Sequence, residues 1–174
     1  MRIGIYGGTF NPIHRGHIAA ASAVARQLSL DKILLIPDAV PPHKPLPAGS
    51  AGEQDRLEMA RLCTGEFPVP AEVSDMEIRR QGASYTCDTL SALREQYPSD
   101  ELFLLMGSDM FLSFESWHRP EEICRQATLA VFSRQSADET ADFARQREKL
   151  ETAFHARVVI VENPEVIPVS STRL

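Results

Sequence analysis

The sequence has 174 residues, of which 43% are hydrophobic and 24% are charged, and its formal net charge is −6 at pH 7. This length fits one domain whose core needs no disulfide or metal to hold it, so we expect a single domain over residues 1–174. The acidic balance argues against a nucleic-acid-binding protein, and no apolar stretch approaches the ~20 residues of a membrane-spanning helix.

The first predicted element is a buried strand over residues 2–6, with no signal peptide before it. Gly7 and Gly8 follow this strand and allow a tight turn and a close approach of the backbone to a ligand. The Asn-Pro pair at 11–12 marks a further turn, after which helical spacing begins at His14. One face of this helix carries the apolar residues Ile18, Ala21, Ala25 and Leu28. A strand, a glycine turn and a helix N-terminus in this order predict a binding site for an anion.

Apolar patterns in the rest of the chain predict alternating strands and helices. The further strands are expected over residues 32–36, 67–73, 101–106, 128–132 and 157–161, and the further helices over residues 53–63, 86–97, 120–126 and 137–154. Pro68 and Pro70 indicate that the strand at 67–73 lies at a sheet edge or starts late. Residues 37–52 are rich in Pro, Ala and Gly and predict a long loop of the kind that is often functional.

The alternation predicts a Rossmann-like α/β domain, with a mostly parallel sheet and helices on both faces. Ligands of such sheets bind beyond the carboxyl ends of the strands, and Gly7, Pro37 and Gly107 each follow a predicted strand. Neither the G-x-G-x-x-G fingerprint nor the Walker sequence of a P-loop is present. Cys63, Cys87 and Cys124 form no C-x-x-C pair, so we expect free thiols in a cytoplasmic protein rather than a zinc site or disulfides.

Several motifs together resemble one family. They are H-x-G-H at residues 14–17, P-P-H-K at 41–44, S-Y-T-C-D-T-L at 84–90, G-S-D at 107–109, the single Trp117, and S-S-T at 170–172. This set is similar to bacterial nicotinate-nucleotide adenylyltransferases of the nucleotidylyltransferase superfamily. The resemblance implies an enzyme that transfers AMP from ATP to nicotinate mononucleotide, giving deamido-NAD and pyrophosphate. The mononucleotide phosphate would attack the α-phosphorus directly and in line.

The resemblance also implies a role for each motif. His14 and His17 are the expected catalytic residues, because imidazole N–H groups can donate hydrogen bonds to phosphate oxygens. Contacts with ATP are expected from Gly7, Gly8, Thr9, Phe10, Gly16, Lys44, Gly107, Asp109, Ser170, Ser171 and Thr172. Contacts with the mononucleotide are expected from His43, Tyr85, Thr86, Trp117 and His118. Mg²⁺ is expected to arrive with ATP, with no metal site in the protein itself.

Residue chemistry alone leaves simpler interpretations open at several of these positions. Thr86, Asp109 and the hydroxyls of residues 170–172 can each cap a helix. His43 and Lys44 can form a solvated surface pair, and a lone tryptophan is often a core residue. The polar neighbours of Trp117 nevertheless predict partial exposure of its ring, whereas two histidines around Gly16 favour contact with phosphate.

Two features depart from the family pattern. His118 stands where relatives commonly have tyrosine, and the chain stops at Leu174, before the arginine and helix that follow the last motif of the family. We therefore expect a C-terminal helical tail to be truncated or absent. Two other functions stay open: an adenylyltransferase for another phosphate monoester, such as phosphopantetheine, and a non-catalytic nucleotide-binding domain. The oligomeric state cannot be inferred from the sequence.

Overall fold

The computed structural model describes residues 1–8, 10, 13–38, 52–80, 85–133 and 137–162. These residues form one six-stranded sheet in which every neighbouring pair is parallel, in the order β3-β2-β1-β4-β5-β6. The strands are β1 (Arg2–Gly8), β2 (Lys32–Pro37), β3 (Ala71–Val73), β4 (Glu101–Met106), β5 (Thr128–Ser133) and β6 (Val158–Glu162). This order is that of the doubly wound Rossmann fold and confirms the predicted fold class.

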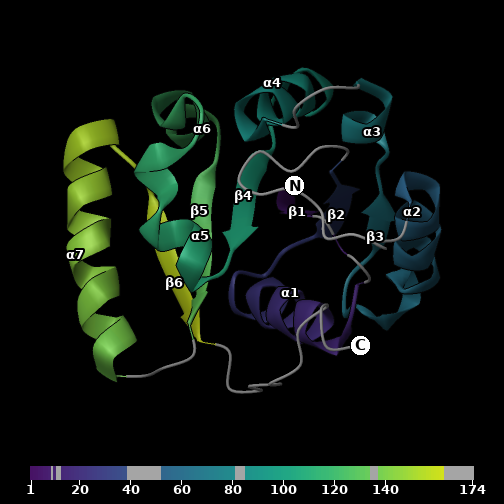
Figure 1. Ribbon diagram of the computed structural model, residues 1–174, viewed down its shortest axis with the longest axis horizontal. Coiled ribbons are helices and arrows are strands. Elements are labelled where there is room, and N and C mark those ends of the chain that lie inside the picture. The colour runs from purple at the N-terminus through teal and green to yellow at the C-terminus, as the bar shows by residue number, and fades with distance from the viewer. Residues whose placement is uncertain (9, 11–12, 39–51, 81–84, 134–136, 163–174) are drawn as a thin grey trace.

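Helices cover both faces of the sheet (Figure 1). They are α1 (Arg15–Gln27), α2 (Glu53–Leu62), α3 (Met76–Arg80), α4 (Thr86–Gln96), α5 (Ser108–Leu112), α6 (Pro120–Gln126) and α7 (Ala137–Phe154), with short 3-10 turns at Thr64–Glu66 and Phe114–Ser116. In Figure 1, α7 and α2 lie at opposite ends of the molecule.

Alternating strand residues feed two separate cores. In β4, Leu102 and Leu104 point to a core shared with α4, α5, α6 and α7. Phe103 and Leu105 point to the other face, where Val24 of α1 covers the sheet. Since successive side chains of a strand point to opposite faces, a strand buried on both sides reads as a continuous apolar run.

The structure confirms most of the predicted elements, and the differences have local causes. The strand predicted over 67–73 begins only at Ala71 and lies at the sheet edge, as the two prolines indicated. The predicted first strand is too short, because pairing continues through Gly7 and Gly8. The five-residue α3 was not predicted, since it is too short for a periodic pattern. Most of the loop predicted at 37–52, and the Asn-Pro turn, lie outside the described residues.

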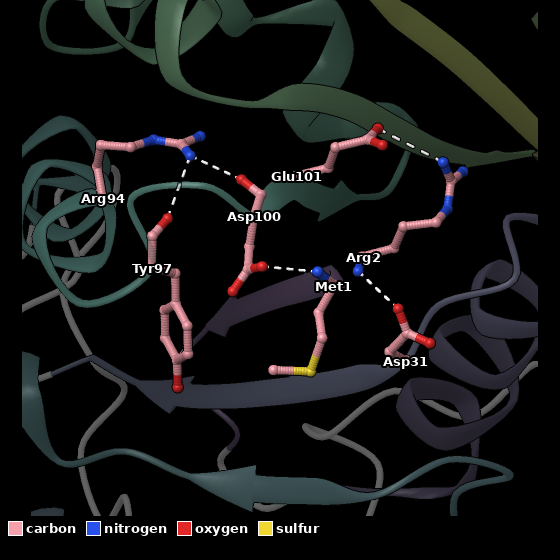
Figure 2. Close-up of polar contacts among 7 residues, drawn as sticks. All are labelled: Met1, Arg2, Asp31, Arg94, Tyr97, Asp100 and Glu101. Carbon is pink, nitrogen blue, oxygen red and sulfur yellow. Dashed lines mark hydrogen bonds and ion pairs between the residues drawn. The ribbon is translucent and has the colours of Figure 1, made fainter.

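Polar contacts tie together the amino-terminal edge of the sheet (Figure 2). The Met1 ammonium lies 2.6 Å from Asp100, and the Arg2 main-chain N–H donates to Asp31 at 2.8 Å. Arg94, in α4, donates to three main-chain oxygens: those of Tyr97, Asp100 and Gln126. Arg94 thereby satisfies carbonyls at the ends of α4 and α6, which helices leave without internal partners.

Within the described residues, no helix has both the length and the apolar character to cross a membrane. Cys63, Cys87 and Cys124 are free thiols, and Cys87 and Cys124 are buried. Burial is the main cause that raises the pKa of each of these three thiols, to about 11 for Cys124. They are therefore thiols rather than reactive thiolates near neutral pH.

Candidate active site

Several of the predicted site residues lie at the carboxyl edge of the sheet. Gly8, Pro37 and Met106 end the central strands β1, β2 and β4 at this edge, because the strands are parallel. The helices α1, α4 and α5 also begin at this edge. Predicted residues that lie outside the described residues are Thr9, His43, Lys44, Ser170, Ser171 and Thr172.

Gly7 and Gly8 extend β1 rather than making a tight turn. They pair with Ile36 and Pro37 of β2, which corrects the role predicted for them in a turn. Among the described residues, a Cβ atom on Gly7 would lie 3.7 Å from the Ile36 main-chain oxygen, and one on Gly8 would lie 3.5 Å from the Phe10 ring. Both are ordinary contact distances, so packing against the described residues does not require either glycine, and the lack of a side chain lets a ligand approach the backbone.

His14 and His17 form a reciprocal cap at the N-terminus of α1. His14 is the N-cap residue, and its Nδ1 accepts the Gly16 main-chain N–H at 3.0 Å. His17 Nδ1 accepts the His14 main-chain N–H, also at 3.0 Å. The two rings stack with centroids 3.9 Å apart and an angle of 26° between their planes. This arrangement uses histidines where a capping box usually has Ser or Thr and Glu or Gln.

The capping bonds fix the tautomer of both rings. A ring nitrogen that accepts an N–H carries no proton, so the neutral rings carry their proton on Nε2, which is then a donor. Burial, reinforced by the neighbouring His14, lowers the pKa of His17 to about 4, and burial also lowers the pKa of His14. Both imidazoles are therefore neutral Nε2–H donors near neutral pH.

Two aromatic side chains pack against the His17 ring. Phe10 meets the His17 ring edge to face at 5.2 Å and 89°, and Tyr6 meets it at 6.1 Å. Phe10 is buried and adopts a positive φ of 47°, which is unusual for a residue with a side chain. The ATP contact predicted for Phe10 therefore falls on a residue that is only 3% exposed and packs against the imidazole.

A helix N-terminus is present at Tyr85 and Thr86, where contacts with the mononucleotide were predicted. The helix begins at Thr86, and Tyr85 is the N-cap residue, with no side-chain hydrogen bond to the cap. The interpretation of Thr86 as a capping side chain is therefore wrong. A polar network supports this end: Thr89 Oγ1 donates to Glu77 at 2.7 Å and accepts from Arg80 at 3.0 Å.

Trp117 is a core residue in this structure, which corrects the predicted partial exposure. Its side chain lies in the same core as α4 and α7, and the residue is 8% exposed. The ring packs against Phe114 with centroids 5.1 Å apart. Polar neighbours in sequence were misleading because the 3-10 turn at 114–116 directs Phe114 and Trp117 inward, while Glu115 is half-buried and Ser116 is exposed.

His118 stacks on Tyr85 instead. The centroids of the two rings are 4.2 Å apart and the planes differ by 25°. His118 is exposed and Tyr85 half-buried, so this pair presents an aromatic surface beside the α4 N-terminus. The structure thus joins two motifs that lie more than 30 residues apart in the chain.

Gly107 and Asp109 lie at the start of α5. Gly107 is the N-cap residue and no side chain caps this helix, so the interpretation of Asp109 as a cap is also wrong. Asp109 is exposed. A Cβ atom on Gly107 would come within 3.0 Å of Phe132, so close packing alone accounts for the glycine there.

Asp38 and Arg56 are site-edge residues that the sequence analysis missed. Arg56 is fully buried in α2, and its Nη1 donates to the main-chain oxygen of Asp38 at 2.9 Å. Asp38 follows β2 directly, and its N–H donates to the Gly8 oxygen at 2.9 Å. A signal existed in the sequence: Arg56 lies four residues before the apolar Ala60, one turn away on the same side of the predicted helix.

Metal-binding clusters and pockets do not add to this site. No group of three or more His, Cys, Asp or Glu side chains suited to a metal occurs among the described residues. A surface pocket between α6 and the C-terminal end of α7 contains none of the predicted site residues. Its lining includes Cys124 and Arg157, which precede the amino ends of β5 and β6, so it lies at the opposite edge of the sheet.

Comparisons with known proteins agree with this fold and place the chain in a family. The cytidylyltransferase-like family model matches residues 5–174. A probable nicotinate-nucleotide adenylyltransferase of Carboxydothermus hydrogenoformans is 36% identical over 95% of this chain and 80% of its own length. One of Geobacter metallireducens is 47% identical over 79% of this chain, and the match spans 62% of that relative.

Solved structures match as well. Nicotinic acid mononucleotide adenylyltransferase of Plasmodium falciparum, complexed with NaAD, superposes with a TM-score of 0.71 over 98% of this chain and 80% of its own, at 16% identity. That identity supports the fold alone. The family match and the Carboxydothermus relative go further: the chain belongs to the cytidylyltransferase-like family and, within it, to the nicotinate-nucleotide adenylyltransferases.

Proposed function

We propose that the protein transfers AMP from ATP to nicotinate mononucleotide, giving deamido-NAD and pyrophosphate. Family membership supports this activity, and one observation carries it: His14 and His17 are held as two neutral Nε2–H donors at the N-terminus of α1. Donors fixed in this way can bind non-bridging phosphate oxygens and stabilise the charge that develops during transfer.

The chemistry needs no protein nucleophile. The second pKa of a phosphate monoester is about 6, so the mononucleotide phosphate is largely dianionic near neutral pH. One of its oxygens forms the new bond to the α-phosphorus of ATP, and the bond from that phosphorus to the β-phosphate oxygen breaks. Pyrophosphate leaves with that electron pair, and the imidazoles position and stabilise without accepting a proton.

We propose that the nucleotide lies over the ends of β1 and β4. Gly7, Gly8 and Gly16 would allow its phosphates to approach the backbone, and Gly107 with Asp109 would contact the nucleoside part. Phe10 would act mainly by packing under His17. Thr9, Lys44, Ser170, Ser171 and Thr172 complete the proposed ATP site.

The mononucleotide would bind beside α4. Its carboxylate suits the first-turn N–H groups of this helix, because Tyr85 caps it with no side-chain bond and helix N-termini favour anions. The exposed His118, stacked on Tyr85, offers a flat surface to the pyridine ring. Thr86 and His43 complete this proposed site, and the core residue Trp117 would support it by packing rather than by contact with the substrate.

We propose that Mg²⁺ is bound through the triphosphate, where it would neutralise charge on the β- and γ-phosphates. The donors present fit that arrangement, since the described edge offers imidazole and main-chain N–H groups, which suit phosphate oxygens. We also propose a cytoplasmic location, where ATP is available.

Incubation with ATP, Mg²⁺ and a panel of phosphate monoesters tests the proposal. Pyrophosphate should form fastest with nicotinate mononucleotide, and the paired product should be deamido-NAD by mass spectrometry. Faster release with phosphopantetheine would support the sister activity. No release with any acceptor, together with measurable ATP binding, would indicate a non-catalytic nucleotide-binding domain.

A further inference from the structure

A charged side chain is buried at the edge of the proposed triphosphate site. The Arg56 side chain has no exposed surface, and its Nη1 lies 3.7 Å from Asp38 Oδ1 as well as 2.9 Å from the Asp38 main-chain oxygen. Removing a guanidinium from water is costly, and hydrophobic residues of similar size often serve stability as well or better. The position of this pair therefore calls for a reason other than stability.

Asp38 connects Arg56 to the strand that carries the glycines. Its main-chain oxygen accepts from Arg56, while its main-chain N–H donates to the Gly8 oxygen at 2.9 Å. Gly8 also pairs with Pro37, the residue before Asp38. Arg56 thus clamps the junction at which β1 and β2 end side by side.

Contacts continue from this junction to the catalytic imidazole. Gly8 lies against Phe10, since a Cβ atom built on it would be 3.5 Å from that ring. Phe10 in turn meets His17 edge to face with centroids 5.2 Å apart. This series of contacts connects the strand ends to His17, and the variants described below test whether the two are coupled.

Charge gives a second reason for an arginine at this position. The Asp38 side chain is 11% exposed and lies at the edge where we propose that a polyanion binds. Without a nearby cation it would repel the triphosphate, and the Arg56 guanidinium compensates its charge.

We propose that Arg56 is a positioning residue for ATP, which it does not touch: it holds the ends of β1 and β2 and neutralises Asp38. The inference rests on the proposed function for the identity of the polyanion. Arg56→Met should therefore raise the KM and the Kd for ATP by about 3- to 30-fold, a size typical of coupling through intermediate residues. The KM for nicotinate mononucleotide should change much less, because the N-terminus of α4 takes no part in the contacts that join Arg56, Asp38 and Gly8.

Arg94 provides a matched control. It is also an arginine that binds main-chain oxygens, but at the opposite edge of the sheet (Figure 2). Arg94→Met should lower Tm and leave the KM for ATP unchanged. The imidazole NMR signals of His17 should shift in Arg56→Met and not in Arg94→Met, a difference that a general loss of stability cannot produce.

Asp38→Asn separates the two effects of Arg56. Added to Arg56→Met, it removes the negative charge of the Asp38 side chain and should restore part of the ATP affinity, while the loss due to the released strand ends remains. Arg56→Lys keeps the charge and serves where Arg56→Met does not fold; it should fall between wild type and Arg56→Met in Kd for ATP.

The outcomes distinguish the two proposals. If wild type binds ATP but adenylates no acceptor, the proposed function fails, and Kd values from calorimetry still test the role of Arg56. If wild type is active and Arg56→Met and Arg56→Lys leave the Kd and KM for ATP as in Arg94→Met, Arg56 is a structural residue only. An equal rise of KM for both substrates would likewise overturn the inference.

Discussion

His14 and His17 together cap the first turn of α1. The His17 ring accepts the His14 main-chain N–H, and the His14 ring accepts the main-chain N–H of Gly16, the residue before His17. The cap and the proposed catalysis depend on the same bonds, because an Nδ1 that accepts a main-chain N–H leaves Nε2 as the donor. Protonation of Nδ1 would break the cap. Stability and activity should therefore respond together to pH at this turn.

Substitution of His17 tests its catalytic role. We expect His17→Ala to lower kcat by about 10²–10³-fold, the usual loss for one transition-state donor, with a smaller effect on the Kd for ATP. His17→Gln is the matched control for the cap, since glutamine can accept the His14 N–H from the same position. His17→Gln should keep the Tm near that of wild type, whereas His17→Ala should lose stability as well. Wild-type turnover in His17→Ala would remove this residue from the mechanism.

The lowered pKa of His17 predicts a loss of stability in mild acid. Its pKa is about 4 in the folded protein against 6.5 in a model compound, so between these values the unfolded state binds more protons. Stability then rises with pH across this window: the contribution is complete above pH 6.5 and disappears as the pH falls toward 4. Its full size is at most about 3–4 kcal/mol.

Urea unfolding at pH 7, 6 and 5 measures this dependence. His17→Gln carries no titrating ring and should lose less free energy of unfolding over the same interval than wild type. Because His14 shares the direction of the shift, part of the slope should remain in that variant. Parallel slopes for wild type and His17→Gln would show that His17 titrates normally.

Much of the molecule could be predicted from the sequence because its elements are locally consistent. The continuous apolar runs of β2 and β4 predict strands buried on both faces, and Pro120 marks the start of α6. The glycine turn was wrong because strand pairing through Gly7 and Gly8 depends on β2, a partner 29 residues away that no local pattern shows.

The side-chain partners of the site were less accessible to sequence analysis. The burial of Trp117, its contact with Phe114 and the stacking of Tyr85 on His118 arise when α4 and the segment after α5 pack together. For His14 and His17, the sequence predicted only that the two side chains lie close together, because they are three residues apart on one helix turn. Its tautomers follow from main-chain bonds that only the structure gives.

Trp117 should matter more for stability than for binding. Its ring fills part of the core beside Phe114, so Trp117→Ala should destabilise the protein by about 3–5 kcal/mol, and Trp117→Phe by much less. Because the indole is already buried, nicotinate mononucleotide should change its fluorescence only modestly. Chemical unfolding and a fluorescence titration check both statements. Strong quenching with an unchanged Tm in Trp117→Ala would instead indicate a ring that leaves the core to stack on substrate.

Magnesium should leave with the nucleotide. Calorimetric titration of MgCl₂ into the protein without ATP should give no binding tighter than about millimolar, because Mg²⁺ needs carboxylates or phosphates and keeps most of its waters. The reaction should still require Mg²⁺ and saturate with the concentration of Mg–ATP. A tight site in the nucleotide-free protein would place the metal on the protein.

The N-terminus of α4 should make the enzyme prefer the acid over the amide. A carboxylate accepts charge-assisted hydrogen bonds from first-turn N–H groups that a neutral amide replaces only in part, and the difference is worth about 1.5–3 kcal/mol. We therefore expect kcat/KM for nicotinate mononucleotide to exceed that for nicotinamide mononucleotide by about 10- to 150-fold. His118→Ala removes the ring stacked on Tyr85 and should raise the KM of both mononucleotides alike, so the ratio stays, since the ring surface is common to both. Thr86→Pro removes a main-chain donor at the first helical position, a place that tolerates proline, and should lower the ratio itself. Equal kcat/KM values for acid and amide in wild type would exclude a carboxylate at this helix end.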